Sequence, residues 1–178
     1  MRSMVEEILK ALKNANLLTE GTLVMIKGGF GKEVFNFAGE KVESNLFARI
    51  AAPFALFTSG KYSSEYCKMG RAAHAANDDA AMMFGSKVKC LKGKAPKTSC
   101  LLFNEGFLVV GRFPGELVAA AILLEKMCKA EILSKKIGKI RRLPAFLCAI
   151  ERLAYLKIYS KKEKGNYDQG RRVAEADN

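Results

Sequence analysis

The stretch CLLFNEGFLVVG, residues 100–111, decides the fold prediction because it has the pattern of two apolar strands joined by a tight turn. The turn is Asn104-Glu105-Gly106, and the runs on either side are built for burial. Two such runs joined by a short turn that contains glycine predict a β-hairpin. Its one acidic side chain, Glu105, is either chemically active, a replacement for an active residue, or a polar turn residue.

Segments on both sides of this hairpin alternate between helical and β-rich patterns. Pro114 opens a long helix, since proline in the first turn lacks only an N–H that would be unbonded, and Gly138 ends it. Pro144 starts another helix. Before the hairpin we expect a helix at 4–18, strands at 21–29 and 32–39, a helix at 43–51, a strand at 54–60, mostly helix at 62–84 and a strand at 87–91. This order predicts a sheet with helices on its faces, an α/β or α+β domain.

The bulk composition of the 178 residues, 49% apolar and 27% charged, is that of an ordinary soluble globular protein. No apolar run approaches the roughly 20 residues of a membrane helix, and the first residues lack the apolar core of a signal peptide. We therefore expect a cytoplasmic protein without membrane contact. Residues 1–158 are predicted to form one domain, and the polar residues 159–178 a flexible tail.

Five scattered cysteines and a single histidine restrict the site chemistry. Without a C-x-x-C pair, the cysteines indicate reduced thiols used as small core residues and neither a disulfide framework nor a zinc knuckle. One imidazole cannot make a three-histidine catalytic zinc site, and His74 is expected to be a partly exposed helix residue. We therefore predict no metal site and no cofactor.

The hairpin and the helix after it resemble the C-terminal part of the class II aldolase/adducin family. That family has an apolar strand, Asn-His-Gly, an apolar strand ending in glycine, and a helix with a Leu-Glu pair. Here the corresponding residues are NEG at 104–106, Gly111 and the Leu-Glu pair at 124–125. The segment FTSGKY at 57–62 is similar to the family's His-Thr-His-Ser-x-Tyr strand end, and DDAAMMFGSKV at 78–88 is similar to a further family segment.

The resemblance implies a three-layer α/β/α sandwich with a central mixed, mostly antiparallel sheet. In the family, three histidines bind a divalent metal that stabilises an enediolate, and a glutamate moves a proton. The three ligand positions here hold Phe57, Ser59 and Glu105, so metal-dependent lyase activity is not expected. Glu43 falls in the stretch that resembles the family's Ser-Ser-Glu, which makes it the candidate catalytic residue. The predicted residues of the former cleft are Phe57, Ser59, Glu105, Lys41, Lys61 and Asn104.

Three functions follow as alternatives from these residues and from the formal charge of +12, given by 30 basic and 18 acidic residues. The first is a non-catalytic or diverged aldolase/adducin-like protein whose cleft binds an anionic small molecule or a protein partner. The second is a basic nucleic-acid-binding protein, because lysine and arginine cluster at 87–97, 135–142 and 161–172.

The third alternative is a metal-independent sugar-phosphate lyase. Glu43 or Glu105 would act as its base, and Lys41 or Lys61 would form a Schiff base or act as the electrophile. Members of the family commonly assemble into rings with the cleft between subunits. The resemblance therefore also implies a homo-oligomer.

Overall fold

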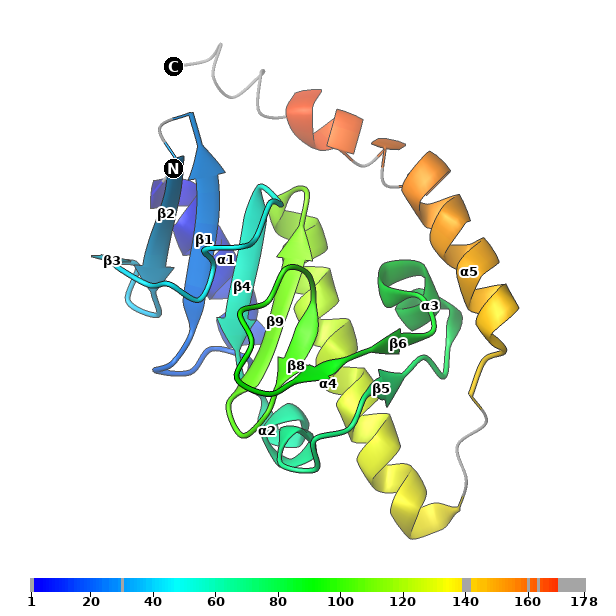
Figure 1. Ribbon diagram of the computed structural model, residues 1–178. Coiled ribbons are helices and arrows are strands. Elements are labelled where there is room, and N and C mark those ends of the chain that lie inside the picture. Colours follow the sequence, from blue (N-terminus) through cyan, green and yellow to red (C-terminus); the bar gives the residue numbers. More distant parts are fainter. Residues whose placement is uncertain (1, 30, 139–141, 160, 163, 170–178) are drawn as a thin grey trace.

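The computed structural model describes residues 2–29, 31–138, 142–159, 161–162 and 164–169, and its centre is a seven-stranded sheet (Figure 1). The elements in chain order are α1 (Arg2–Asn14), β1 (Leu23–Gly28), β2 (Gly31–Asn36), β3 (Lys41–Val42), β4 (Phe54–Thr58), α2 (Lys61–Cys67), β5 (Ala73–His74), α3 (Asp78–Phe84), β6 (Lys87–Val88), β7 (Cys90–Leu91), β8 (Cys100–Leu102), β9 (Gly106–Gly111), α4 (Pro114–Ile137), α5 (Ala145–Ala154) and the π-helix η1 (Tyr155–Tyr159).

The strands of the central sheet follow the order β3-β2-β1-β4-β9-β8-β7. Each neighbouring pair is antiparallel except β7 and β8, which are parallel. The strands β5 and β6 form a separate antiparallel pair. The predicted α/β class with a mixed, mostly antiparallel sheet is therefore confirmed.

The hairpin predicted at 100–111 forms strands β8 and β9. Cys100 pairs with Leu108, and Leu102 pairs with Gly106 next to the turn. Asn104 has a φ of 62°, in the left-handed region that asparagine adopts more readily than most residues. Because β9 also pairs with β4 on its other side, β9 is an interior strand of the sheet, next to the central strand β4.

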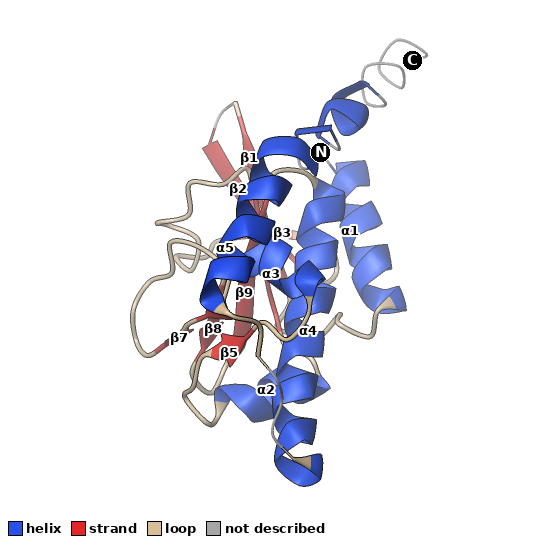
Figure 2. Ribbon diagram, turned by 90° about the vertical axis from the view of Figure 1, so that its right-hand side faces the viewer, coloured by secondary structure: helices blue, strands red, loops and turns tan. Residues whose placement is uncertain are grey.

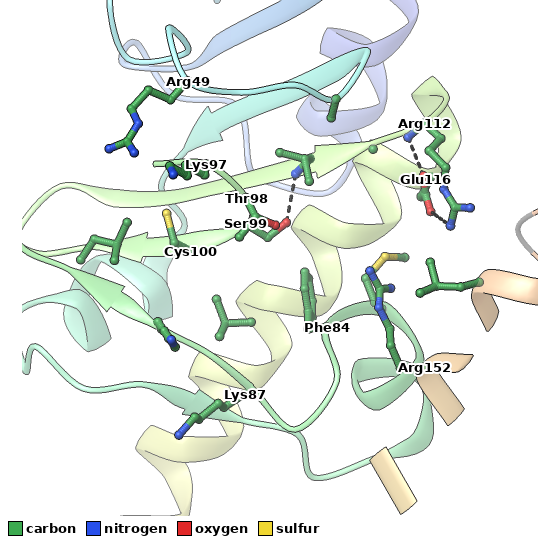
Figure 3. Close-up of a pocket in the computed structure, with 18 of the residues that line it drawn as sticks. Arg49, Phe84, Lys87, Lys97, Thr98, Ser99, Cys100, Arg112, Glu116 and Arg152 are labelled. Carbon is green, nitrogen blue, oxygen red and sulfur yellow. Dashed lines mark hydrogen bonds and ion pairs between the residues drawn. The ribbon is translucent and has the colours of Figure 1, made fainter. Parts of the chain in front are cut away.

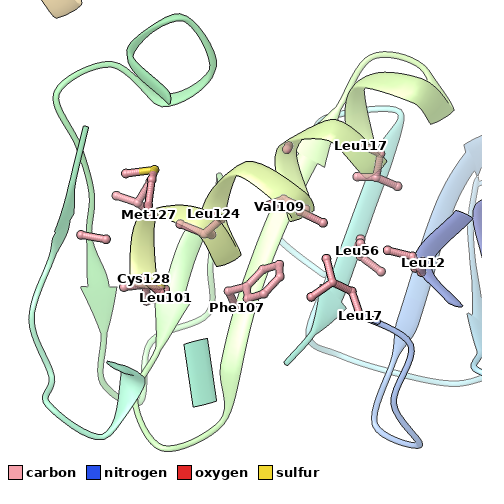
Figure 4. Close-up of a cluster of buried hydrophobic side chains, with 14 of the residues drawn as sticks. Leu12, Leu17, Leu56, Leu101, Phe107, Val109, Leu117, Leu124, Met127 and Cys128 are labelled. Carbon is pink, nitrogen blue, oxygen red and sulfur yellow. The ribbon is translucent and has the colours of Figure 1, made fainter. Parts of the chain in front are cut away.

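The helices α1, α2 and α4 cover one face of the sheet (Figure 2). Leu56 of β4 and Phe107 and Val109 of β9 pack against Leu117 and Leu124 of α4 (Figure 4). All five side chains are fully buried. Each burial of this kind stabilises the fold by roughly 1.5–3 kcal/mol, so the long helix predicted from Pro114 is a main support of the sheet.

The opposite face of the sheet is covered by the segment 43–52, which forms turns and no helix. Phe47 and Ile50 are almost fully buried against this face. The Lys32 ammonium group donates to the carbonyl oxygens of Phe47 and Ala48, at 2.9 and 2.7 Å. The backbone bonds of the segment, such as that from the Ile50 N–H to the Phe47 carbonyl at 3.1 Å, close single turns, so the predicted helix at 43–51 was wrong.

The region predicted as mostly helical at 62–84 contains two short helices separated by the strand β5. Gly70, with a φ of 62°, lies in the turn that follows α2. His74 belongs to β5, not to a helix as expected, and its Nδ1 lies 3.2 Å from Oε1 of Glu131 in α4. Arg142 approaches the same carboxylate at 3.5 Å. The single histidine thus helps to attach the small β5–β6 sheet to α4.

The predicted tail begins after residue 158, and part of it is described. Residues 161–162 and 164–169 are helical, and the ring of Tyr167 stacks on Phe113 with centroids 6.0 Å apart. Residues 170–178 lie outside the described residues, so the domain boundary at 158 stays a prediction. Of the helices that the structure describes, none is both long and apolar enough to cross a membrane.

Candidate functional site

Phe57, Ser59 and Glu105 gather at one corner of the sheet, where β4 ends and the β8–β9 turn begins. Thr58 of β4 pairs with Phe107 of β9 in an antiparallel register, so one step further along β4 Ser59 lies beside Gly106, the residue that follows Glu105. A Cβ atom placed on Gly106 would lie 3.0 Å from the Cβ atom of Ser59. The structure therefore brings together the three positions that resemble the family's metal ligands, and we call this place the corner.

The side chains at the corner are poorly suited to hold a metal ion. Phe57 has no donor atom and packs against the apolar cluster on the second face of the sheet. Ser59 is half-buried, whereas Asn104 and Glu105 are exposed. Over the described ranges, no three His, Cys, Asp or Glu side chains lie close enough together to bind a metal, and no basic group forms an ion pair with Glu105.

Glu125 of α4 stabilises the helix that follows the corner. Its two carboxylate oxygens accept hydrogen bonds from the backbone N–H groups of Tyr62 and Ser63, at 2.7 and 3.0 Å. These are N–H groups of the first turn of α2, which have no partner within the helix. Gly60 leaves room for this contact, because an added Cβ there would overlap the Glu125 carboxylate. Glu125 is thus occupied as a helix cap.

A pocket of about 490 Å³ lies at the other end of β8 and β9, and we call it the basic pocket (Figure 3). Val110 contributes to the lining of this pocket. It lies five residues along the chain from Glu105, a separation of about 16 Å on an extended strand. Seven of the twenty described residues that line the pocket are basic: Arg49, Lys87, Lys89, Lys94, Lys97, Arg112 and Arg152.

One carboxylate, that of Glu116, lines the basic pocket and is occupied by hydrogen bonds. It accepts from the Arg112 guanidinium at 3.1 Å and from the Tyr155 hydroxyl at 2.8 Å. Arg152 donates to the carbonyl oxygen of Met82 at 2.8 Å, and burial lowers the pKa of Arg152, an effect that Glu116 opposes. Among the described side chains, no carboxylate pairs with the other five cations. The pocket therefore has a strong excess of positive charge.

Comparison with known proteins gives a match at the level of structure. No family model and no curated protein matches this sequence. An L-fuculose 1-phosphate aldolase superposes with a TM-score of 0.68 at 12% identity, over 86% of this chain and 94% of that one. The L-fuculose 1-phosphate aldolase from Glaciozyma antarctica PI12 gives a TM-score of 0.65 at 16% identity, over 85% of this chain and 79% of that one.

An aldolase II superfamily protein from Pseudomonas syringae gives a TM-score of 0.62 at 14% identity, over 88% of this chain and 83% of that one. The chain has the class II aldolase fold. The likeness of the hairpin at 100–111 and the helix α4 to that family is therefore matched by the whole fold.

Two residues predicted for the cleft of this aldolase fold lie away from the corner. Lys41 belongs to β3 at the sheet edge, three strand spacings or about 14 Å from β4, and it pairs with Glu33 at 2.7 Å. Glu43 follows β3 in the direction of the Phe54 end of β4, opposite to Ser59. The structure therefore does not bring Lys41 and Glu43 to the corner.

Lys61 does adjoin the corner, as the first residue of α2. It is exposed, and its ammonium group lies 5.6 Å from the centroid of the Tyr62 ring. Sequence reasoning missed the basic pocket as a site, although the lysines at 87–97 were visible as a charged run. The arginines at 49, 112 and 152 come from three other parts of the chain, and only the tertiary fold of the aldolase type brings them together.

Proposed function

We propose that this chain is a class II aldolase-like protein that binds an anionic small molecule in the basic pocket and does not carry out metal-dependent aldol cleavage. The observation that carries the proposal is the group of seven lysine and arginine side chains around a pocket of about 490 Å³ with one carboxylate. A pocket of this volume suits a small metabolite. The cations would attract anions and raise their local concentration.

The second half of the proposal rests on the side chains of the corner. Aldol cleavage needs a cation near the oxyanion that forms as the carbon–carbon bond breaks. Phe57 supplies no ligand atom, and the neutral hydroxyl of Ser59 is a poor one. Glu105 would be left to hold a metal ion alone. This supports the proposal that the protein has lost metal-dependent aldol cleavage.

Binding of phosphorylated probes tests the first half. We expect isothermal titration calorimetry to detect binding of pyrophosphate or ADP to the wild-type chain and an affinity about tenfold lower in Lys97→Ala, because one charge of the pocket is removed. Lys10→Ala removes an exposed charge of α1 and serves as the matched control. If neither probe binds at millimolar concentration, the anion-binding proposal is refuted.

Elemental analysis tests the second half. The purified chain is expected to contain far less than one zinc, iron or manganese ion per molecule. It is also expected to show no enzymatic activity that a chelator abolishes. One tightly held ion per chain would refute the proposed loss of the metal site.

The two alternative functions gain no specific support. A lysine that forms a Schiff base needs burial to lose its proton near neutral pH, and both Lys41 and Lys61 are exposed. The lysines of the 87–97 run mostly line the basic pocket, where a small ligand fits better than a nucleic-acid helix. Parts of the other two basic clusters, at 139–141 and 171–172, lie outside the described residues.

We also propose that the protein forms a homo-oligomer and is located in the cytoplasm. The apolar run around Phe54–Thr58 forms the internal strand β4. Large apolar side chains are instead exposed on α5, at Phe146, Ile150 and Leu153, and burial of such a patch favours association. Sedimentation velocity should give a species larger than a monomer, and a monomer at high micromolar concentration would refute this part.

A further inference from the structure

The floor of the basic pocket is apolar even though its walls are charged. Phe84 at the end of α3 is half-buried and points into the pocket (Figure 3). Val88, Leu91, Val110 and Leu156 add aliphatic surface to the lining. Removal of such apolar surface from water by a ligand favours binding. The pocket thus offers binding energy to an apolar group as well as to an anion.

The cations stand on opposite sides of this floor. Figure 3 shows Arg49 and Lys97 on one side and Arg112 and Arg152 on the other, with Phe84 between them. Arg49 and Lys97 are exposed, whereas Arg112 and Arg152 are half-buried. A ligand that lies over Phe84 would therefore have cations within reach at its edges.

Uncharged polar side chains are scarce in the lining. Thr98 and Ser99 are the two that the described residues supply, and the Ser99 hydroxyl already accepts the backbone N–H of Val110 at 3.0 Å. Glu116 is occupied by Arg112 and Tyr155. A ligand rich in hydroxyl groups would leave several of them without partners, which weakens binding. The lining is thus a poor match for the polyhydroxyl body of a sugar.

We infer that the basic pocket takes a phosphorylated molecule that carries a flat aromatic group, as a nucleoside phosphate does, in preference to a phosphate whose whole body is a polyhydroxyl sugar. The aromatic group would lie against Phe84, and the phosphate groups would reach the cations at the rim. The inference rests on the proposed anion binding and adds the class of ligand to it. It also separates this pocket from the corner, since none of the residues invoked belongs to the former metal positions.

Four probes separate the contributions of the aromatic group and of the phosphate. Calorimetric titrations use ADP, adenosine, ribose 5-phosphate and pyrophosphate, each against the full-length chain. We expect ADP to bind about tenfold more tightly than ribose 5-phosphate or pyrophosphate, because stacking of a base on an aromatic ring adds to the charge attraction. Adenosine should bind more weakly than ADP, since it lacks the groups that the cations recognise.

Phe84→Leu tests the aromatic contact without emptying the site. Leucine keeps apolar volume but removes the flat ring, so the affinity for ADP should fall about fivefold, while that for ribose 5-phosphate stays unchanged. Phe146→Leu, at an exposed position of α5 outside the pocket lining, is the matched control. Circular dichroism and thermal melting confirm that both variants fold.

The outcomes distinguish this inference from the proposed function. If ribose 5-phosphate binds as tightly as ADP, or if Phe84→Leu leaves the affinity for ADP unchanged, the inferred ligand class is wrong while anion binding stands. If no phosphorylated probe binds, both fail. Tighter binding of ADP that depends on Phe84 and Lys97 supports both.

Discussion

The corner and the basic pocket lie at opposite ends of the β8–β9 hairpin, and they differ in the chemistry of their side chains. The corner contains an apolar ring, a hydroxyl and one exposed carboxylate, at Phe57, Ser59 and Glu105. The pocket contains seven cations around an apolar floor. The same strands support both places, so the backbone alone does not decide which of them is suited to a ligand. Side-chain chemistry favours the pocket.

Introducing three metal-binding side chains at the corner should reduce the difference between the corner and the basic pocket most strongly. The triple variant Phe57→His, Ser59→His and Glu105→His places three imidazoles at the corner. We expect it to bind zinc on the order of 10³-fold more tightly than the wild-type chain, because histidine nitrogens are preferred zinc ligands. Competition with a chromogenic chelator measures the affinity. Equal zinc affinities of a folded variant and the wild type would mean that the three side chains do not converge.

Gly60→Ala tests whether the corner is held by the contact between α2 and α4. The new methyl group would displace the Glu125 carboxylate and break its two hydrogen bonds to backbone N–H groups. We expect the free energy of unfolding to fall by about 2–3 kcal/mol, measured by urea denaturation. Glu125→Ala should cost a similar amount, and the double variant little more, since both changes remove the same contact. Additive losses would contradict this.

Denaturation at alkaline pH compares the ionisation of two buried thiols, one near the corner and one in the lining of the basic pocket. Burial raises the pKa of both Cys67, next to the corner, and Cys100, in the pocket lining, from 9.0 to about 12. Because the unfolded thiols ionise first, stability is intact below pH 9 and falls between pH 9 and 12, by about 1 kcal/mol per pH unit for each thiol. Cys67→Ala and Cys100→Ala should each reduce this slope in urea titrations, and unchanged slopes would show that the thiols ionise normally in the fold.

Removing a cation of the pocket should have the smallest effect on stability. Lys97 and Lys87 are exposed and make no ion pair with a described carboxylate. We expect Lys97→Ala and Lys87→Ala to change the free energy of unfolding by less than about 0.5 kcal/mol while they weaken anion binding. A large loss of stability would indicate that these lysines support the fold and not a ligand.

Much of the fold follows from local sequence signals. The apolar runs around Asn104-Glu105-Gly106 specify a hairpin by themselves, and Pro114 marks the start of α4, as the structure confirms. The segment 43–52 could not be predicted in this way. Its apolar residues Phe47 and Ile50 have a spacing that also suits a helix, and the Lys32 contacts that hold the turns come from a distant strand.

The candidate sites were predictable to different extents. Phe57, Ser59 and Glu105 were found by resemblance, and the strand register places them at one corner. Lys41 and Glu43 were grouped with them because they are near in sequence to a family motif, but β1 and β2 separate β3 from β4. The basic pocket combines four chain segments, so no local pattern marked it as a site.

The most direct test of the account is a crystal structure of the chain soaked with zinc and ADP, with data collected at the zinc absorption edge. The account predicts density for the nucleotide among Phe84, Lys97 and Arg152, and no anomalous peak at the corner. A zinc ion bound between Ser59 and Glu105, with the basic pocket empty, would contradict it.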